Sequence, residues 1–414
     1  MNDGDTVRTG EALPEFPVAR ECPFHPPAGY EELRTRGAVT KVRLPGGRTA
    51  WAVTGHAEAR ALLADPTMSS DHHRPNFPFA EPAMAALKDR SAGLPVGALV
   101  RTDPPEHTTQ RRMLIPSFTV RRNAALRPDI QRIVDERLDA MLDHGSPADL
   151  VSAFALPVAS GTICELLGVP YEDHDFFEEQ ARRRFTPGQV VDAFTALADY
   201  LDGLIRAKEK SPGDGLLDDL VTEQVVPGRL ERSELVRYAM TLLLAGHDTS
   251  AHMIALSVLT LLEHPAQLAA LRAEPELLPG AIEELLRYLS IIGSLARVAT
   301  RDIEIGGRLI RAGDGVLIAS GAVNYDAAHF DHPRELDVRR SARNHVAFGY
   351  GVHQCIGQNL ARVEMDVALR TLFERVPSLR LAVPAEEVPV KQGLFFGLEE
   401  LMVAWDGSGE GPQT

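Results

Sequence analysis

The chain has 414 residues, of which 44% are hydrophobic, and its formal net charge is −15 at pH 7. This hydrophobic content is sufficient for a large buried core, and the acidic total argues against nucleic acid or an anionic membrane as a partner over the whole surface. Because the three cysteines are widely spaced, we expect no disulfide framework and a reducing compartment.

The N-terminal stretch MNDGDTVRTGEALPEF is acidic and polar. It has no basic start followed by an apolar run, so we predict no signal peptide. No apolar stretch is expected to reach the roughly 20 residues that span a bilayer. We therefore expect a cytoplasmic protein without a membrane segment, composed of a flexible segment at 1–20, a single domain at 21–406 and a flexible tail at 407–414.

The first regular elements are predicted to be short. Residues 39–44 and 49–55 alternate as strands around a Pro-Gly-Gly turn, and 56–65 have the pattern of a short helix. Residues 70–102 are rich in Pro, Gly, Asn and Phe, which predicts a long loop. A loop of this length in a compact protein is usually functional, often as a lid.

Helical periodicity dominates from Asp103 to about Pro275, with apolar residues at i, i+3 and i+4. The clearest patterns lie at 126–145, 152–168, 192–210 and 231–263. The last would be about 50 Å long at 1.5 Å per residue. Because its middle is apolar nearly all round, it should cross the core.

The C-terminal part adds a helix at 275–289, a hairpin at 302–320 and a long helix after Cys355. No internal repeat and no linker interrupts the chain. We therefore predict one large, mainly α domain with a minor β portion.

One cysteine lies in a glycine-dense loop, FGYGVHQCIG, at residues 348–357. A lone cysteine is usually buried packing, as we expect for Cys164. A zinc site would need a second Cys/His pair at ligand spacing, and a dinucleotide-binding loop would need a glycine where Gln354 stands. A cysteine protease would need more than a cysteine near a histidine.

The remaining option for Cys355 is a thiolate ligand to a haem iron, which requires backbone N–H donors aimed at the sulfur. Glycines permit the tight backbone that aims such donors. A helix beginning just after Cys355 would stabilise the thiolate through its N-terminal dipole. His353 lies two residues before the ligand and could reach a haem propionate.

The pattern F-G-x-G-x-H-x-C-x-G resembles the haem-ligand signature of the cytochromes P-450, and every fixed position matches, including Phe348, Gly349, Cys355 and Gly357. The resemblance spans essentially the whole chain. It implies the cytochrome P450 fold, an α-rich lobe plus a small β-rich lobe around a buried haem b (iron protoporphyrin IX), with Cys355 as the axial ligand of the iron. The stretches FPVARECPFHPP, ALLADP and DPPEHTTQRR are similar to those of soluble bacterial, especially actinobacterial, members.

The stretch EELLRY places Glu284 and Arg287 at i, i+3 on one helix face. On its own such a pair is a solvated salt bridge worth little. The resemblance maps the family's structural E-x-x-R pair onto these residues. Its third member, an arginine before the cysteine loop, corresponds best to Arg340, with Arg339 as the alternative.

The stretch DPPEHTTQRRML offers cationic and donor groups for two propionates. We expect Asp103 to cap a helix whose first positions are Pro104 and Pro105. His107 and Arg111 then stand at i, i+4 on one face. The resemblance implies that both bind propionates, together with Arg297 in LARVATRDIEI.

The long helix carries the polar cluster of LLLAGHDTS, which is costly in an apolar helix because Asp and Thr compete for backbone carbonyls. The family pattern A/G-G-x-D/E-T matches Ala245, Gly246, His247, Asp248 and Thr249. The resemblance implies a groove for O2 at Ala245 and Gly246. It also implies that Thr249 holds the water network that delivers protons, with Asp248 as the acidic relay.

The implied function is a monooxygenase that inserts one oxygen atom of O2 into a C–H bond of a bulky, largely hydrophobic secondary metabolite or xenobiotic. Epoxidation, ring closure and phenol coupling remain alternatives, whereas a non-catalytic haem sensor is disfavoured by the intact acid–threonine pair. Family position predicts these substrate-contacting residues: Phe79, Leu243, Ile291, Ile292, Leu295, Leu394 and Phe395.

The resemblance also implies partners. Electrons would come from a ferredoxin and a ferredoxin reductase, because the chain has no dinucleotide fingerprint of its own. Arg111, Arg112 and Arg362 are candidates for a basic landing patch on an otherwise acidic protein. We expect a monomer.

Overall fold

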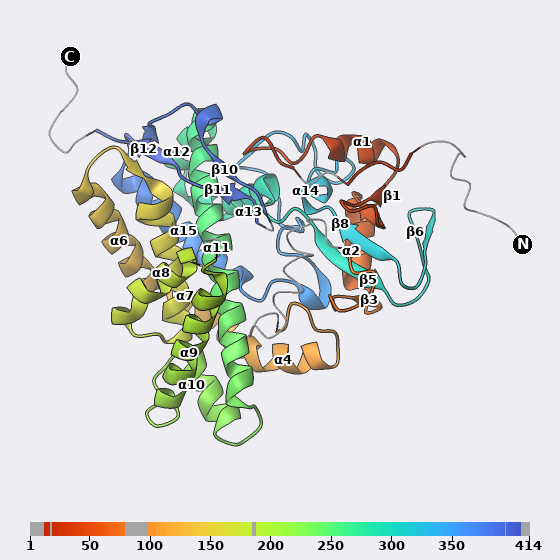
Figure 1. Cartoon of the computed structure of the whole chain (residues 1–414). Coiled ribbons are helices and arrows are strands. Elements are labelled where there is room, and N and C mark those ends of the chain that lie inside the picture. The colour runs from red at the N-terminus through yellow and green to blue at the C-terminus, as the bar shows by residue number, and fades with distance from the viewer. Residues whose placement is uncertain (1–11, 17–18, 79–97, 184–187, 394, 407–414) are drawn as a thin grey trace, which may run out of the picture.

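The computed structural model describes residues 12–16, 19–78, 98–183, 188–393 and 395–406. Within them, helices form a large lobe, and the main sheet forms a smaller lobe beside it (Figure 1). The predicted tail at 407–414, and residues 1–11 of the segment expected to be flexible, lie outside the described residues.

The predicted helical patterns correspond to helices of the large lobe. These are α4 (Glu106–Leu114), α5 (Val120–Ala125), α6 (Arg127–His144), α7 (Leu156–Leu167), α8 (His174–Arg183), α9 (Val190–Lys208), α10 (Leu216–Leu220), α11 (Arg232–Glu263), α12 (Pro265–Ala273), α13 (Leu278–Leu289) and α15 (Gln358–Arg375). Three short helices accompany the smaller lobe: α1 (Gly29–Thr35), α2 (His56–Ala64) and α14 (Ser320–Val323).

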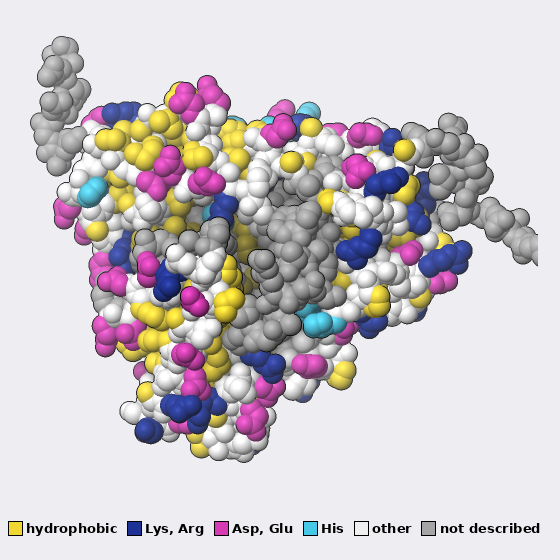
Figure 2. Space-filling view, viewed as in Figure 1, with side chains coloured by type: hydrophobic (Ala, Val, Ile, Leu, Met, Phe, Trp, Pro, Cys, Tyr) yellow, Lys and Arg dark blue, Asp and Glu magenta, His cyan; other side chains and the backbone are white. Residues whose placement is uncertain are grey.

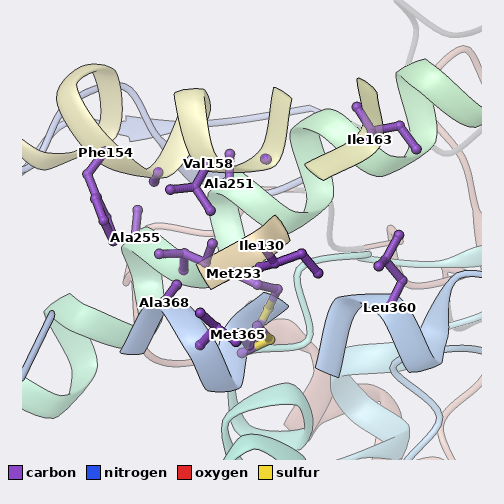
Figure 3. Close-up of a cluster of buried hydrophobic side chains, with 14 of the residues drawn as sticks. Ile130, Phe154, Val158, Ile163, Ala251, Met253, Ala255, Leu360, Met365 and Ala368 are labelled. Atoms are coloured by element: carbon purple, nitrogen blue, oxygen red, sulfur yellow. The ribbon is translucent and has the colours of Figure 1, made fainter. Parts of the chain in front are cut away.

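Helix α11 crosses the core, as its sequence predicts, and packs against α7, α9 and α15. In Figure 3, side chains of α11 such as Ala251 and Ala255 lie between Val158 of α7 and Ala368 of α15. At Gly246 a Cβ atom would lie 2.9 Å from the Cδ1 of Ile163 on α7, so a larger residue at this position would require that side chain to move.

Contrary to the expectation drawn from hydropathy, α11 is long and apolar enough to cross a membrane by length and composition. However, 78% of its most apolar 18-residue window is buried inside the protein. It is the one helix among the described residues that meets this criterion, and a core helix has the same composition.

The smaller lobe contains a five-stranded sheet in the order β1-β2-β8-β5-β3. Its strands are β1 (Val39–Arg43), β2 (Thr49–Val53), β3 (Met68–Ser69), β5 (Leu295–Ala299) and β8 (Gly315–Ile318). The first two pair antiparallel around the predicted turn. Because β5 is paired on both sides, the sheet holds its side chains in fixed positions.

The expectation of one hairpin over 302–320 is correct only for its first half. Strands β6 (Ile303–Ile305) and β7 (Arg308–Ile310) pair with each other, whereas β8 joins the large sheet beside β2 and β5. All four residues of β8 are buried, and alternate side chains enter hydrophobic clusters on opposite faces of the sheet. A strand with apolar side chains on both faces buries more apolar surface as a central strand of a sheet than as one arm of a separate hairpin.

Two small sheets complete the fold. One contains β4 (Ala148–Asp149), β12 (Met402–Ala404) and β9 (Arg380–Leu381), and the other contains β10 (Val390–Lys391) and β11 (Gly397–Leu398). The backbone N–H of Phe396 donates to the carbonyl of Ile291, at 2.8 Å. This contact brings the C-terminal segment beside the chain that connects α13 to β5.

Candidate active site

The loop that carries Cys355 depends on glycine at two positions. Gly349 and Gly351 have φ angles of 67° and 72°, in the left-handed region where side chains are strained. At Gly351 a Cβ atom would also lie 2.3 Å from the carbonyl oxygen of Leu63. The resulting turn returns the N–H of Cys355 to the carbonyl of Phe348, at 2.8 Å, which aims the cysteine inward.

Cys355 is an exposed residue, and it lines a cavity. Burial of its thiol among protein groups raises the pKa, while the backbone N–H groups of Gly357 and Gln358 and the charges of Arg111 and Arg362 act in the opposite direction. Helix α15 begins at Gln358. These donors and the helix N-terminus favour the thiolate, but burial outweighs them, and the pKa of the Cys355 thiol is raised above its usual value.

The cavity at Cys355 has a volume of about 110 Å³ and is bounded by α11, α7, α15 and the cysteine loop. Its lining residues are Phe118, Ala159, Thr162, Ile163, Leu242, Ala245, Gly246, Thr249, Ser250, Phe348, Cys355, Ile356, Gly357, Leu360, Ala361 and Glu364. The structure thus brings Thr249 and Ser250 of the polar cluster on α11 to the same space as the thiol, although more than one hundred residues separate them from Cys355 in the sequence.

Within that cluster the two predicted catalytic residues differ in position. Thr249 lines the cavity, and its hydroxyl donates to the carbonyl of Ala245 at 2.7 Å. Asp248 is buried, and its Oδ1 lies 3.1 Å from the Nδ1 of His247. It is not among the residues that line the cavity within the described chain.

Four groups predicted to bind propionates cluster near the cysteine loop. The rings of His107 and His353 lie 4.0 Å apart between centroids. Burial, followed by the charges of Arg297, His107 and Arg111, lowers the pKa of His353 to about 3. Burial likewise lowers the pKa of Arg297, to about 10. Such a concentration of donors is stabilised by negative charge.

These groups fit the haem that the sequence predicts. Neither ring nitrogen of His107 has a hydrogen-bond partner among the described residues, although the residue is only 1% exposed. Buried donors and acceptors are normally satisfied, so the position calls for a polar ligand. A thiol with backbone donors, a cavity beside it and buried cationic groups near its loop together form the donor set of a thiolate-ligated haem.

The expected capping role of Asp103 is wrong. Helix α4 has Pro105 at its N-cap position and no side-chain cap. The carboxylate of Asp103 instead accepts hydrogen bonds from the hydroxyl of Ser69 and the backbone N–H of Ser70, the latter at 2.7 Å. It therefore ties strand β3 to the start of α4, which carries His107.

Glu284 and Arg287 form a fully buried ion pair rather than a solvated one, with both side chains 0% exposed. Arg287 donates to the carboxylate at 2.7 and 2.8 Å. Of the two candidate arginines, Arg340 is the one that contacts Glu284, at 3.0 Å. Arg339 pairs with Glu274 in an exposed salt bridge.

Arg287 extends the network towards the cysteine loop. Its Nη1 donates to the carbonyls of Asn324 and Pro333, both at 2.9 Å. The side-chain amide oxygen of Asn324 in turn accepts from the N–H of Val346 at 2.8 Å. The network thus connects α13 to the chain that leads directly into the loop.

A second cavity, of about 280 Å³, lies between the segment after α13, the segment at 395–396 and the N-terminal part of the chain. Of the predicted substrate-contacting residues, the structure brings Ile291, Ile292, Leu295 and Phe395 to its lining. Leu243 is buried in the core and lines neither cavity. Phe79 and Leu394 lie outside the described residues.

The predicted landing-patch arginines are not equivalent. Arg112 is exposed on α4. Arg362 donates to both carboxylate oxygens of Glu283, which His345 also contacts. Burial alone would raise the pKa of Glu283, but its hydrogen bonds to His345 and Arg362 outweigh burial and hold it at about 2. Arg362 is thus held in an internal ion pair.

One cavity-lining acid was missed by the sequence analysis. Glu364 on α15 is 2% exposed and lines the cavity at Cys355. The signal was an acid within the apolar run VEMDVAL, where a fully solvated side chain is not expected.

Comparison with known proteins agrees with this geometry. The family model for Cytochrome P450 matches residues 166–391. Pentalenic acid synthase of Streptomyces avermitilis is 57% identical over 394 residues, which cover 94% of this chain and 97% of that protein.

Solved structures give the same result over nearly the whole chain. Cytochrome P450 MoxA from Nonomuraea recticatena is 48% identical with a TM-score of 0.91, covering 96% of this chain and 99% of its own. Mycinamicin VIII C21 methyl hydroxylase from Micromonospora griseorubida, solved with mycinamicin VIII bound, is 44% identical with a TM-score of 0.86. The match covers 95% of this chain and 100% of that one. The fold expected from the resemblance is confirmed, and the chain belongs to the cytochrome P450 family.

Proposed function

We propose that this enzyme is a haem-thiolate monooxygenase that hydroxylates a bulky, largely hydrophobic secondary metabolite or xenobiotic. The observation that carries the proposal is the position of the Cys355 thiol, which opens onto the same cavity as Thr249 and is surrounded by backbone N–H donors. When bound, a thiolate-ligated haem supplies reductive activation of O2.

The residues of the chain would then divide the remaining tasks. Cys355 would bind the iron, while His107, Arg111, Arg297 and His353 would hold the propionates. Thr249 stands at the cavity wall with its hydroxyl on the carbonyl of Ala245, where it can hold and orient water for proton delivery. The mostly apolar walls of the cavity at Cys355 would exclude bulk water, which limits side reactions.

The proposal for the substrate rests on the second cavity. Its apolar side chains outnumber its polar ones, with Ile291, Ile292, Leu295 and Phe395 in its lining. Two relatives named above are a pentalenic acid synthase and a mycinamicin VIII C21 methyl hydroxylase, the latter solved with mycinamicin VIII bound, which supports the proposed substrate class here.

A spectral screen tests the substrate class directly. Large apolar compounds are expected to displace water from the haem and shift its Soret band, whereas small polar metabolites should leave the band in place. Analysis of the products of each binding compound then separates hydroxylation from epoxidation, ring closure and coupling. Soret shifts confined to small polar metabolites would contradict the proposal.

Substitution of Thr249 tests its role in proton delivery. In Thr249→Ala, haem and substrate binding should persist, while the product formed per NADPH consumed should fall about tenfold because a water-orienting hydroxyl is lost. Released hydrogen peroxide should rise in parallel. Thr260→Ala is the matched control, because Thr260 makes the same type of bond on α11, to the carbonyl of Leu256 at 2.7 Å, and lines neither cavity.

We also propose a ferredoxin and its reductase as electron donors, a cytoplasmic location and a monomeric state. Acidic and basic side chains are interspersed on the face shown in Figure 2, so docking would depend on a local patch. Arg112→Glu should raise the KM for ferredoxin on the order of tenfold at low ionic strength, with a smaller effect at high salt. Exposed Arg308, in the β6–β7 hairpin, provides the control Arg308→Glu, and equal effects of both variants would contradict a patch at Arg112.

A further inference from the structure

The cavity of about 280 Å³ is charged in only one sense. Its described lining residues include three arginines, Arg20, Arg101 and Arg297, and no aspartate or glutamate. The composition of the chain predicts the opposite, because the sequence has 58 acidic against 43 basic residues. Tyr30, the other ionisable side chain of the described lining, is neutral, since burial raises the pKa of its phenol well above the usual value. The described walls therefore carry positive charge alone.

Two of these three arginines already have partners or a proposed task. Arg297 is one of the groups proposed above to hold a haem propionate. Each of the three guanidinium nitrogens of Arg20 donates to a backbone carbonyl, at 2.6 to 3.2 Å, and the group lies 4.1 Å from the centroid of the Phe396 ring. Burial lowers the pKa of Arg20 to about 10, so the side chain stays charged at neutral pH. Arg20 is thus a fixed positive charge whose nitrogens are engaged by the chain.

Arg101 differs from both. It is partly buried and lines the cavity, yet it forms no hydrogen bond or ion pair with any residue that the structure describes. Burial lowers its pKa, and no neighbouring acid acts in the opposite direction. A guanidinium has five N–H donors, and polar groups removed from water are normally satisfied. The position therefore calls for an anionic ligand from outside the chain.

The acid closest to Arg101 in the sequence is engaged elsewhere. The carboxylate of Asp103 accepts hydrogen bonds from the hydroxyl of Ser69 and the backbone N–H of Ser70, and Arg74 lies 3.8 Å from it. These contacts hold Asp103 on strand β3. The charge of Arg101 is consequently left to the cavity.

The remaining lining indicates the chemistry of the ligand. Apolar side chains such as Ile291, Leu295 and Phe395 form much of the wall, which suits a large apolar body. One guanidinium without a partner suits one carboxylate, whose two oxygens match its paired N–H donors. A dianionic phosphate would require more cations than this arginine provides.

We propose that Arg101 binds a carboxylate of the substrate, so that the preferred substrates are bulky apolar molecules that carry one carboxylic acid group. This inference rests on the proposed function, because it takes the cavity of about 280 Å³ as the substrate site. The fixed charge of Arg20 adds to the attraction, and positive walls in an acidic protein concentrate anionic ligands at this cavity. An anchored carboxylate also fixes the orientation of the apolar body for oxidation.

The first test compares acids with their esters. The ferric holoenzyme is titrated by calorimetry at pH 8 with abietic acid, dehydroabietic acid and 1-adamantanecarboxylic acid, each paired with its methyl ester. The wild type should bind the acid about tenfold more tightly than the ester in at least one pair, because a hydrogen bond to a charged group contributes about that factor.

Three variants assign this preference to one side chain. Arg101→Gln should bind the acid and the ester of the pair equally, whereas Arg101→Lys, which keeps the charge but not the forked donors, should restore part of the preference. Arg308→Gln is the matched control, because Arg308 is exposed and lines neither cavity, and it should match the wild type. A preference for the acid that persists in Arg101→Gln would overturn the proposal.

Haem content separates substrate binding from haem binding. Since Arg101 makes no bond within the described chain, Arg101→Gln should fold and retain haem as the wild type does. Arg297→Gln should lose haem, because a propionate loses its donor. Equal loss of haem from these two variants would assign Arg101 to the propionates and overturn the carboxylate site.

The two proposals fail in different ways. A panel in which no acid binds the wild type more tightly than its ester, including one in which nothing binds, would overturn the carboxylate site alone. A wild type that binds haem but oxidises neither the panel nor any compound that shifts its Soret band would overturn the proposed function, and the role of Arg101 with it.

Discussion

Replacement of Cys355 by alanine is expected to remove the red-shifted Soret band that a thiolate gives to the reduced, CO-treated protein, and to reduce monooxygenase turnover to background. The reason is that the cavity at this loop has one thiol, stabilised by the N–H groups of Gly357 and Gln358. No other described lining residue of that cavity can supply a thiolate. Difference spectra and the haem content of the purified variant measure the effect.

Cys22→Ala provides the control, since it removes a cysteine that lines neither cavity. It should keep both the band and the turnover of the wild type. A Cys355→Ala protein that retains the red-shifted band would show that the sulfur of Cys355 is not the iron ligand, and this result would contradict the proposed function.

Replacement of Glu284 by glutamine should lower the free energy of unfolding by about 3–5 kcal/mol, because it leaves the charge of a fully buried arginine uncompensated. Arg287 and Glu284 are both 0% exposed, and Arg340 donates to the same carboxylate. Since the network continues through Asn324 to Val346, haem retention should fall together with stability. Urea unfolding and haem content measure the two effects.

The matched control is Arg339→Ala, the neighbour of Arg340 in sequence. Its partner is Glu274, and both side chains are about half exposed, so its loss should cost no more than about 1 kcal/mol. Equal destabilisation by Glu284→Gln and Arg339→Ala would contradict a bracing role for the buried network.

Most of the helical architecture could be predicted from local patterns. The expected helix at 231–263 corresponds to α11 at Arg232–Glu263, because uninterrupted apolar periodicity specifies a helix without reference to the rest of the chain. The hairpin at 302–320 was only half correct. Strand β8 pairs with β2, which lies more than two hundred residues earlier, and no local signal reports such a partner.

The capping prediction for Asp103 failed for a related reason. Asp before Pro-Pro is a good local cap, but Ser69 and Ser70 compete for the same carboxylate from another part of the chain. A short polar side chain forms whichever hydrogen bonds the packing brings within reach.

The sequence by itself was enough to identify the family and the cysteine, because a thiolate loop requires glycine, cysteine and a following helix at fixed spacing. It was not enough to show which groups share the site, since Thr249, Cys355 and Glu364 come from separate elements. It also could not choose between Arg339 and Arg340, which differ by one position in the chain yet pair with different acids. Burial, partner and cavity depend on the packing of distant segments, and those are the properties that set the charge state of a carboxyl group.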